Sequence, residues 1–123
     1  FHTDATSSKM LDLKKNPNAG IHIWLPKVQL QIRMDVVVEI RSGDITIPNW
    51  KNVPTISRIA YGTIPSPGNV IESPFAYDNA PDQKRFAVLV CHIEIIQLLL
   101  LGNKHICANY KKINNWEGEW LSP

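Results

Sequence analysis

The segment KVQLQIRMDVVVEIRSGD, residues 27–44, alternates apolar and polar side chains over a long stretch. Every even position from Val28 to Ile40 is apolar, and every odd position except Val37 is polar or charged. A period of two indicates a β-strand with one face in a core and the other in solvent. A slip of one residue would expose the whole apolar set, so the pattern predicts a strand over 27–41 with a fixed register.

Two later segments also have strand character. The density of Val and Ile in KRFAVLVCHIEI favours a strand over 85–95, although a helix through 85–101 is the alternative. The segment LLLLGNKHICANYKKI indicates a hairpin that turns at Gly102 and Asn103 and continues as a strand over 104–113. The predicted core residues are Val36, Val38, Leu89 and Ile93.

The rest of the chain predicts short elements and loops. A helix of one or two turns is predicted within SSKMLDLKK, capped by Ser8, and residues 1–8 are expected to be mobile. Six of the nine prolines lie in 48–81, which predicts a region of long surface loops because proline removes ladder donors. Short strands are predicted at 21–25, 45–47 and 55–61.

Length and composition suit one globular domain over residues 1–123, with 44% apolar and 20% charged residues. The many predicted strands, long loops and scarce helix indicate an all-β fold, an antiparallel β-sandwich or jelly roll. A net charge of +2 argues against a purely electrostatic nucleic-acid binder. The longest apolar run, IIQLLLLG, is too short to span a membrane, no signal peptide is recognised, and Phe1 suggests a processed product or a fragment.

No phosphate-binding loop, CxxC, HExxH or GxSxG motif occurs in the sequence. Asp35 and Glu39 share a strand face but lie roughly 13 Å apart along it, too far for paired-carboxylate chemistry. The other candidates for metal binding or nucleophilic catalysis are Cys91, His92, His105 and Cys107. Cys91 and His92 point to opposite faces of a strand, which favours a core cysteine and a surface histidine. We therefore expect no catalytic residue, no metal and no cofactor, and the pairing of the two cysteines stays open.

Three segments resemble parts of the jelly-roll capsid proteins of small circular single-stranded DNA viruses. They are AGIHIWLPKVQLQIRMDVVV at 19–38, YDNAPDQKRFAVL at 77–89 and NYKKINNWEG at 109–118, in the order of that family and over about a third of the chain. The Arg-rich N-terminal arm usual in the family is not present, since only Lys9, Lys14 and Lys15 stand there. The resemblance implies a self-assembling shell subunit that is not an enzyme and resides in the virion.

Candidate contact residues follow from this hypothesis. Interleaved charges and exposed aromatic residues suggest an interface between copies of the chain, formed by Arg33, Asp35, Glu39, Arg41, Trp116 and Trp120. Weak contact with single-stranded nucleic acid would involve Lys9, Lys14, Lys15, Lys111 and Lys112. Two alternatives stay open: a soluble β-sandwich module that binds carbohydrate or protein, and a small enzyme built around Cys91, His92 and His105.

Overall fold

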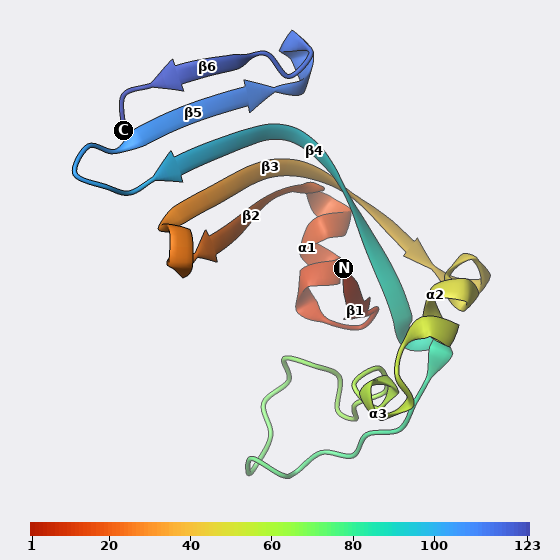
Figure 1. Ribbon diagram of the computed structural model, residues 1–123. Coiled ribbons are helices and arrows are strands. Elements are labelled where there is room, and N and C mark those ends of the chain that lie inside the picture. Colours follow the sequence, from red (N-terminus) through yellow and green to blue (C-terminus); the bar gives the residue numbers. More distant parts are fainter. The chain divides into compact units, whose positions relative to one another are not determined.

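The structure is a computed structural model that describes all residues 1–123, and its main elements are β-strands. Figure 1 shows their arrangement along the chain. The strands are β1 (His2–Asp4), β2 (Asn18–Leu25), β3 (Leu30–Ser42), β4 (Phe86–Leu100), β5 (Ile106–Lys111) and β6 (Gly118–Leu121). The helices are α1 (Ser8–Lys15), α2 (Ile47–Asn52) and α3 (Thr55–Arg58), and the 3-10 turns are η1 (Pro26–Val28), η2 (Gly43–Thr46), η3 (Gln83–Arg85) and η4 (Lys112–Asn114).

The six strands belong to one sheet. Strands β2 to β6 are hydrogen-bonded in that order, and β1 pairs with β4. The neighbours whose registers are known pair antiparallel. The prediction of a mainly β, antiparallel fold with little helix is therefore confirmed. The more specific prediction of a β-sandwich or jelly roll is not confirmed, because the structure has no second sheet to form the opposite layer.

The chain divides into two compact units. Unit 1 contains Phe1–Pro17 and Glu39–Val90, and unit 2 contains Asn18–Val38 and Cys91–Pro123. The two longest strands, β3 and β4, each contribute residues to both units. The expectation of a single domain stays a prediction.

Unit 2 contains two hairpins built on the predicted strand segments. In the first, β2 pairs with β3 from Asn18↔Val37 to Leu25↔Leu30, and Gln29 closes the turn in a left-handed conformation with φ 52°. In the second, β4 pairs with β5 up to Leu100↔Ile106, as the predicted turn near Gly102 requires.

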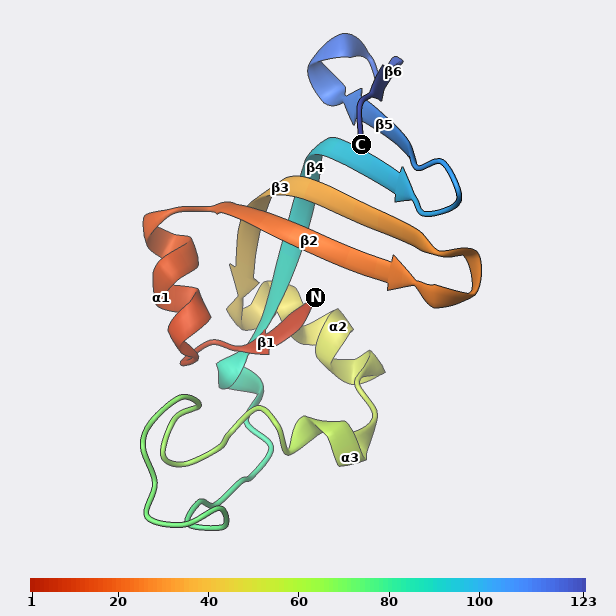
Figure 2. The ribbon, with the colours of Figure 1, turned by 90° about the vertical axis from the view of Figure 1, so that its left-hand side faces the viewer.

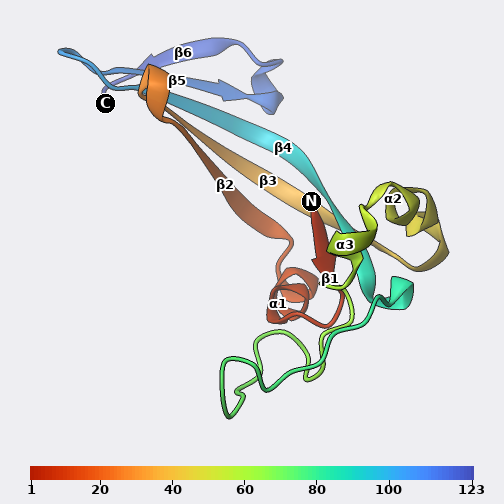
Figure 3. The same ribbon diagram turned by 60° about the horizontal axis from the view of Figure 1, so that its bottom comes forward.

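Unit 1 is organised around Phe86 at the start of β4. Its side chain is fully buried, and its ring centroid lies 4.9 Å from that of His2, 5.3 Å from Trp50 and 5.0 Å from Tyr61. Figure 3 shows α2, which contains Trp50, close to this part of β4. Burial raises the pKa of Tyr61, and the guanidinium of Arg58 lies 5.2 Å from the centre of the Trp50 ring. Contacts between aromatic rings therefore surround the most deeply buried side chain of this unit.

A buried ion pair joins β1 to η3, the turn that leads into β4. Asp4, whose side chain is 4% exposed, lies with Oδ2 at 2.9 Å from Nη2 of Arg85. The other carboxylate oxygen of Asp4 accepts hydrogen bonds from the backbone N–H and the hydroxyl of Thr6 at 2.8 and 2.6 Å. Strand β1 pairs with β4 through His2↔Val88 and Asp4↔Phe86, and Figure 2 shows the two side by side. The mobility expected of residues 1–8 stays a prediction, but Asp4 is firmly bonded here.

The segment after β3 differs from the prediction. Strands were expected at 45–47 and 55–61, but these positions contribute to η2, α2 and α3. Proline explains the difference: Pro48 stands in the first turn of α2, and Pro54 is the N-cap of α3. Proline is well tolerated at the start of a helix because its fixed φ suits the first turn. The residues expected to break strands therefore start helices.

The predictions of core residues and of the N-terminal helix agree with most of the structure. Three of the four predicted core residues, Val36, Val38 and Leu89, are buried, and Ile93 is half-buried. The helix near the N-terminus is present, but its N-cap is Ser7 rather than Ser8, and Ser7 makes no side-chain capping bond. The prolonged β4 excludes the alternative helix through 85–101.

Candidate functional site

A polar cleft in unit 2 is the best candidate for a binding site. Its volume is about 270 Å³, and it opens on one face of the sheet. The lining residues come from β3 to β6: Arg33, Asp35, Ile95, Gln97, Asn109 and Leu121. Gln97 pairs with Asn109 across β4 and β5, so both amides necessarily stand on the same face.

Asn109 is held in place by its neighbours. It is 6% exposed, and its Nδ2 donates a hydrogen bond of 2.9 Å to Oε1 of Glu119. The same oxygen lies 2.7 Å from Nζ of Lys111. Hydrogen bonding to Lys111 and then to Asn109 lowers the pKa of Glu119 below its ordinary 4.5. The bond from Asn109 to Glu119 restricts rotation of the Asn109 amide.

A second depression adjoins the first through Asp35. It is lined by residues of β2, β3 and β4: Asn18, Ala19, Gly20, Asp35, Val36, Val37 and Glu94. Gly20 leaves open space where a side chain would stand, with no atom within 4 Å of a Cβ built there. On the same side of the sheet, His22 lies directly opposite Arg33. The cleft thus carries one cation, Arg33, one carboxylate, Asp35, and two amides, so it offers donors and acceptors to a polar ligand.

The structure separates the six predicted interface residues. Arg33 and Asp35 line the cleft, whereas Arg41 and Glu39 form an exposed ion pair of 2.7 Å. That carboxylate raises the pKa of Arg41 through a hydrogen bond and its charge. Trp116 and Trp120 are 40% and 80% exposed. An interface formed by these residues stays a prediction.

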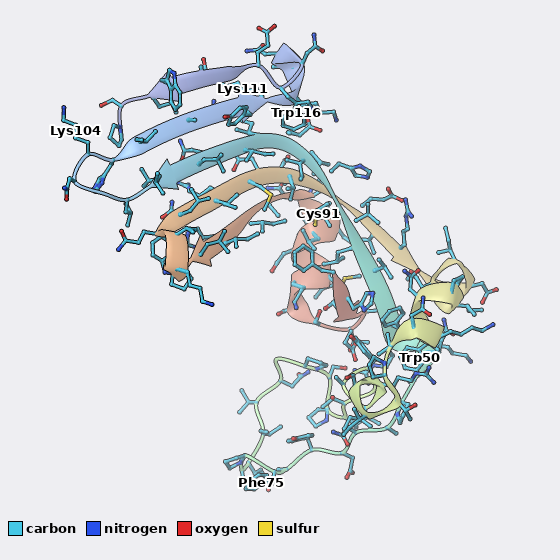
Figure 4. The ribbon with its side chains drawn as sticks, viewed as in Figure 1. Trp50, Phe75, Cys91, Lys104, Lys111 and Trp116 are labelled. Atoms are coloured by element: carbon cyan, nitrogen blue, oxygen red, sulfur yellow. The ribbon has the colours of Figure 1, made fainter.

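The five predicted nucleic-acid contacts also divide into two sets. Lys9, Lys14 and Lys15 lie on α1. The other two are in exposed ion pairs, Lys111 with Glu119 at 2.7 Å and Lys112 with Glu94 at 2.8 Å. Figure 4 labels Lys111 at the end of β5. Nucleic-acid contact stays a prediction.

The cysteines and histidines do not assemble into a site. Cys91 and Cys107 are free thiols, the first half-buried and the second buried. The structure contains no group of three or more His, Cys, Asp or Glu side chains arranged to hold a metal ion. Nδ1 of His105 accepts a 3.4 Å hydrogen bond from the backbone N–H of Gly102, so it takes part in the turn.

Sequence reasoning missed both amides of the cleft. Gln97 interrupts the apolar run IIQLLLL, and a lone amide inside such a strand was a usable signal of a polar face. Asn109 gave no comparable signal, because its position opposite Gln97 depends on the register of β4 and β5.

Comparison with known proteins places the fold. No family model matches the chain. A Caenorhabditis elegans protein assigned as a pyridoxamine 5′-phosphate oxidase is 41% identical over 59 residues, which is 48% of this chain and 26% of that protein. A Schizosaccharomyces pombe protein with the same assignment is 37% identical over 59 residues, again 48% of this chain and 26% of the relative. The matched segment is thus about a quarter of the length of these relatives.

Two solved structures resemble the whole chain. One is a pyridoxamine 5′-phosphate oxidase-related, FMN-binding protein from Nostoc punctiforme, with a TM-score of 0.79, 23% identity and coverage of 100% of this chain and 72% of that one. The chain has the fold of this protein. The second is PhzG from Burkholderia lata in complex with tetrahydrophenazine-1-carboxylic acid, with a TM-score of 0.79, 15% identity and coverage of 100% and 67%.

These findings overturn the capsid hypothesis. The fold is that of an FMN-binding protein and not a viral jelly roll, so the resemblance to capsid proteins, the shell function and the virion location are wrong. The expectation that the chain is not an enzyme is contradicted by relatives assigned as oxidases. The β-sandwich binding module and the Cys/His enzyme match none of these proteins either. None of the helices has the length and apolar character needed to cross a membrane.

Proposed function

We propose that this protein binds FMN and takes part in the oxidation of pyridoxamine 5′-phosphate. The observation that carries the proposal is the 41% identity over 59 residues with a relative assigned that activity. The fold shared with an FMN-binding protein supports the cofactor. Because the matched segment is about a quarter of the curated relatives, the activity of a whole protein is part of the proposal.

The polar cleft offers groups that suit one end of FMN. An FMN molecule has an anionic phosphate at one end and a ring edge rich in carbonyl and N–H groups at the other. The Arg33 guanidinium donates well to a phosphate or a carbonyl, and the amides of Gln97 and Asn109 each donate and accept. Ile95 and Leu121 add apolar surface for a ring.

The size of the cleft limits this fit. Its volume of about 270 Å³ lies just below the roughly 300–1,000 Å³ typical of enclosed ligand sites. The six lining residues therefore suit part of an FMN, and the remainder of the cofactor would extend beyond them.

Residues in and beside the cleft have definable tasks in this proposal. Bound FMN supplies a two-electron acceptor for oxidation of the amine substrate. Arg33 binds and orients the charged or carbonyl-rich end of the cofactor. Glu119, in an ion pair with Lys111, holds the Asn109 amide so that less rotational entropy is lost when a ligand binds.

Flavin titration with a matched pair of variants tests the cofactor proposal. Arg33→Ala removes the cation of the cleft, whereas Arg41→Ala removes an exposed cation of the same strand that does not line it. Loss of a charged hydrogen bond is worth about 1.5–3 kcal/mol, so FMN affinity should fall roughly tenfold or more in the first variant only. No FMN binding by the unaltered chain, or an equal loss in both variants, would refute the proposal.

The proposed oxidation of pyridoxamine 5′-phosphate needs a separate experiment. Pyridoxamine 5′-phosphate added without oxygen should bleach the visible absorption of protein-bound FMN, because the flavin is reduced. Persistent absorption, with FMN demonstrably bound, would restrict the protein to flavin binding.

We also propose that the chain self-associates, as the sequence led us to expect, but through an apolar face of unit 2 rather than through the charged residues of β3. Ile23, Leu25, Leu100 and Ile106 are 40, 40, 38 and 48% exposed, and Trp120 is 80% exposed. Exposed apolar side chains in such number commonly mark a contact with another protein. Trp120→Lys should lower the sedimentation-derived mass of any oligomer, whereas Ile113→Lys, on the separate turn η4, should not.

A further inference from the structure

The segment between α3 and η3 forms a closed loop. Ile64 and Asp78 exchange two backbone hydrogen bonds, Ile64 N–H to Asp78 O at 2.7 Å and Asp78 N–H to Ile64 O at 2.8 Å. One step further out, Asp82 N–H donates to Tyr61 O at 2.9 Å. A surface loop of this length whose ends meet is an Ω-loop, a type that is frequently functional.

The neck of the loop is fixed to the buried part of unit 1. Nη1 of Arg85 donates a 2.9 Å hydrogen bond to the backbone oxygen of Thr63, while Nη2 of the same residue lies 2.9 Å from buried Asp4. Gly62 in the neck lies so close to Ala80 that no side chain would fit. The two ends of the loop are thus held by backbone and ionic contacts, which pre-organises what lies between them.

The loop borders an open cavity of about 470 Å³. This volume lies within the range usual for small-molecule sites. Its apolar lining includes Ile59, Ile71, Tyr77 and two prolines, Pro65 and Pro67. Figure 2 shows that this part of the chain contains no helix or strand between α3 and η3, so the cavity is built by the loop itself.

Its polar lining is entirely uncharged. Thr63, Ser66, Asn69 and Asn79 contribute hydroxyl and amide groups, and no Lys, Arg, His, Asp or Glu lines the cavity. Asn69 is fixed by two bonds to Ser66 O, from its backbone N–H at 3.2 Å and from its Nδ2 at 2.7 Å. Gly68 has a φ of 92°, a conformation that glycine adopts readily because it has no side chain, and this allows the tight turn. The amide oxygen of Asn69 remains as an acceptor.

We infer that this loop is a second binding site, for a neutral aromatic heterocycle that bears an amide or hydroxyl group. A ring matches the tyrosine and aliphatic walls, and the amides and hydroxyls orient one polar substituent. A phosphate or carboxylate would enter without a compensating cation, so charged analogues are discriminated against. The site shares no residue with the polar cleft and does not depend on the proposed flavin chemistry.

Two probes that differ in charge test this inference. Nicotinamide is neutral, and nicotinate has the same ring with a carboxylate in place of the amide. In a ¹⁵N-resolved NMR titration, nicotinamide should shift amide signals within 59–79 with a dissociation constant on the order of 1 mM, as suits a ring-sized fragment. Nicotinate should bind at least tenfold more weakly. Equal binding of the two probes, or shifts confined to other residues, would overturn the inference.

Two neighbouring residues of the loop provide matched variants. Ile71→Asp places a charge on the cavity wall, at a side chain that is 37% exposed and so tolerates substitution. Val70→Asp adds the same charge next to it, on a fully exposed side chain that does not line this cavity. The first variant should weaken nicotinamide binding at least fivefold while the second leaves it unchanged. An equal effect of both, or no effect of Ile71→Asp, would contradict the site. An FMN titration of the same variants reports separately on the proposed function.

Discussion

Replacing Gly62 by alanine should destabilise the protein more than any other glycine-to-alanine change in the chain. A Cβ at this position would overlap the backbone oxygen of Ala80 and lie 2.9 Å from its carbonyl carbon. Carbon atoms in contact normally lie about 3.5–4.0 Å apart, so the carbon contact alone requires the two arms of the neck to separate by roughly 1 Å, and the overlap with the oxygen requires more. The bond from Asp82 N–H to Tyr61 O, now 2.9 Å, would then exceed hydrogen-bonding distance.

The cost follows from these two effects. Forcing extra volume into a packed site costs about 1–3 kcal/mol, and a lost hydrogen bond about 1 kcal/mol, which together give about 2–4 kcal/mol for Gly62→Ala. Gly20→Ala is the control, because nothing lies within 4 Å of the added carbon. It should stabilise the chain by about 0.5–1 kcal/mol, since glycine weakens a strand.

Urea denaturation followed by far-ultraviolet circular dichroism measures both free energies. Amide hydrogen exchange should also show faster exchange at Ile64 and Asp78 in Gly62→Ala alone. A free energy of unfolding within about 0.5 kcal/mol of the unaltered protein, with these amides equally protected, would refute the close approach of Gly62 and Ala80.

Three further predictions concern stability. Arg85→Gln leaves the buried carboxylate of Asp4 without its ionic partner and should cost about 3 kcal/mol, measured by urea denaturation; an unchanged midpoint would mean the pair is not buried in solution. Phe86→Ala should cost about 3–5 kcal/mol, whereas Phe75→Ala, at an 87% exposed side chain, should stay within about 0.5 kcal/mol. The pKa of Glu119 is lower in the folded than in the unfolded chain, so its contribution is complete above pH 4.5 and is lost as pH falls through the folded value. Carboxyl NMR titration should give a pKa below 4.5, and Glu119→Gln should remove that part of the acid dependence.

Strand positions were predictable where one physical signal dominated. Alternation located β3, which buries one face. The density of β-branched residues located β4, whose adjacent residues Phe86 and Ala87 are both buried. The start of β3 was placed three residues early. Pro26–Val28 forms a 3-10 turn and Gln29 adopts a left-handed conformation, which is rare for glutamine and has no reliable sequence signal.

Helices α2 and α3 were not predictable from residue preference alone. Ile47, Thr55 and Ile56 favour strands, and helices this short gain little from helical propensity. Tertiary contacts favour the helical conformation of α2, since Trp50 of this helix packs against the ring of Phe86. Such contacts join residues far apart in the chain and leave no local pattern.

The candidate site was only partly predictable for a similar reason. Arg33 and Asp35 were singled out from the sequence, but as interface residues and not as part of a cleft. The rest of the cleft depends on which residues of β4 and β5 lie opposite each other. The capsid hypothesis failed because it rested on short apolar strand segments, which many β-proteins share. A flavin site built from separate strands also lacks the contiguous glycine-rich motif that reveals nucleotide sites elsewhere.

The four tryptophans offer an optical means of following the two units separately. Trp50 is the single tryptophan of unit 1 and is surrounded by Phe86, Tyr61 and the Arg58 guanidinium, whereas the other three belong to unit 2. A variant that retains only Trp50 would emit solely from the aromatic cluster. Comparing its fluorescence transition with that of a Trp50→Phe variant would reveal whether the units, which share two long strands, lose their structure in one step or in succession.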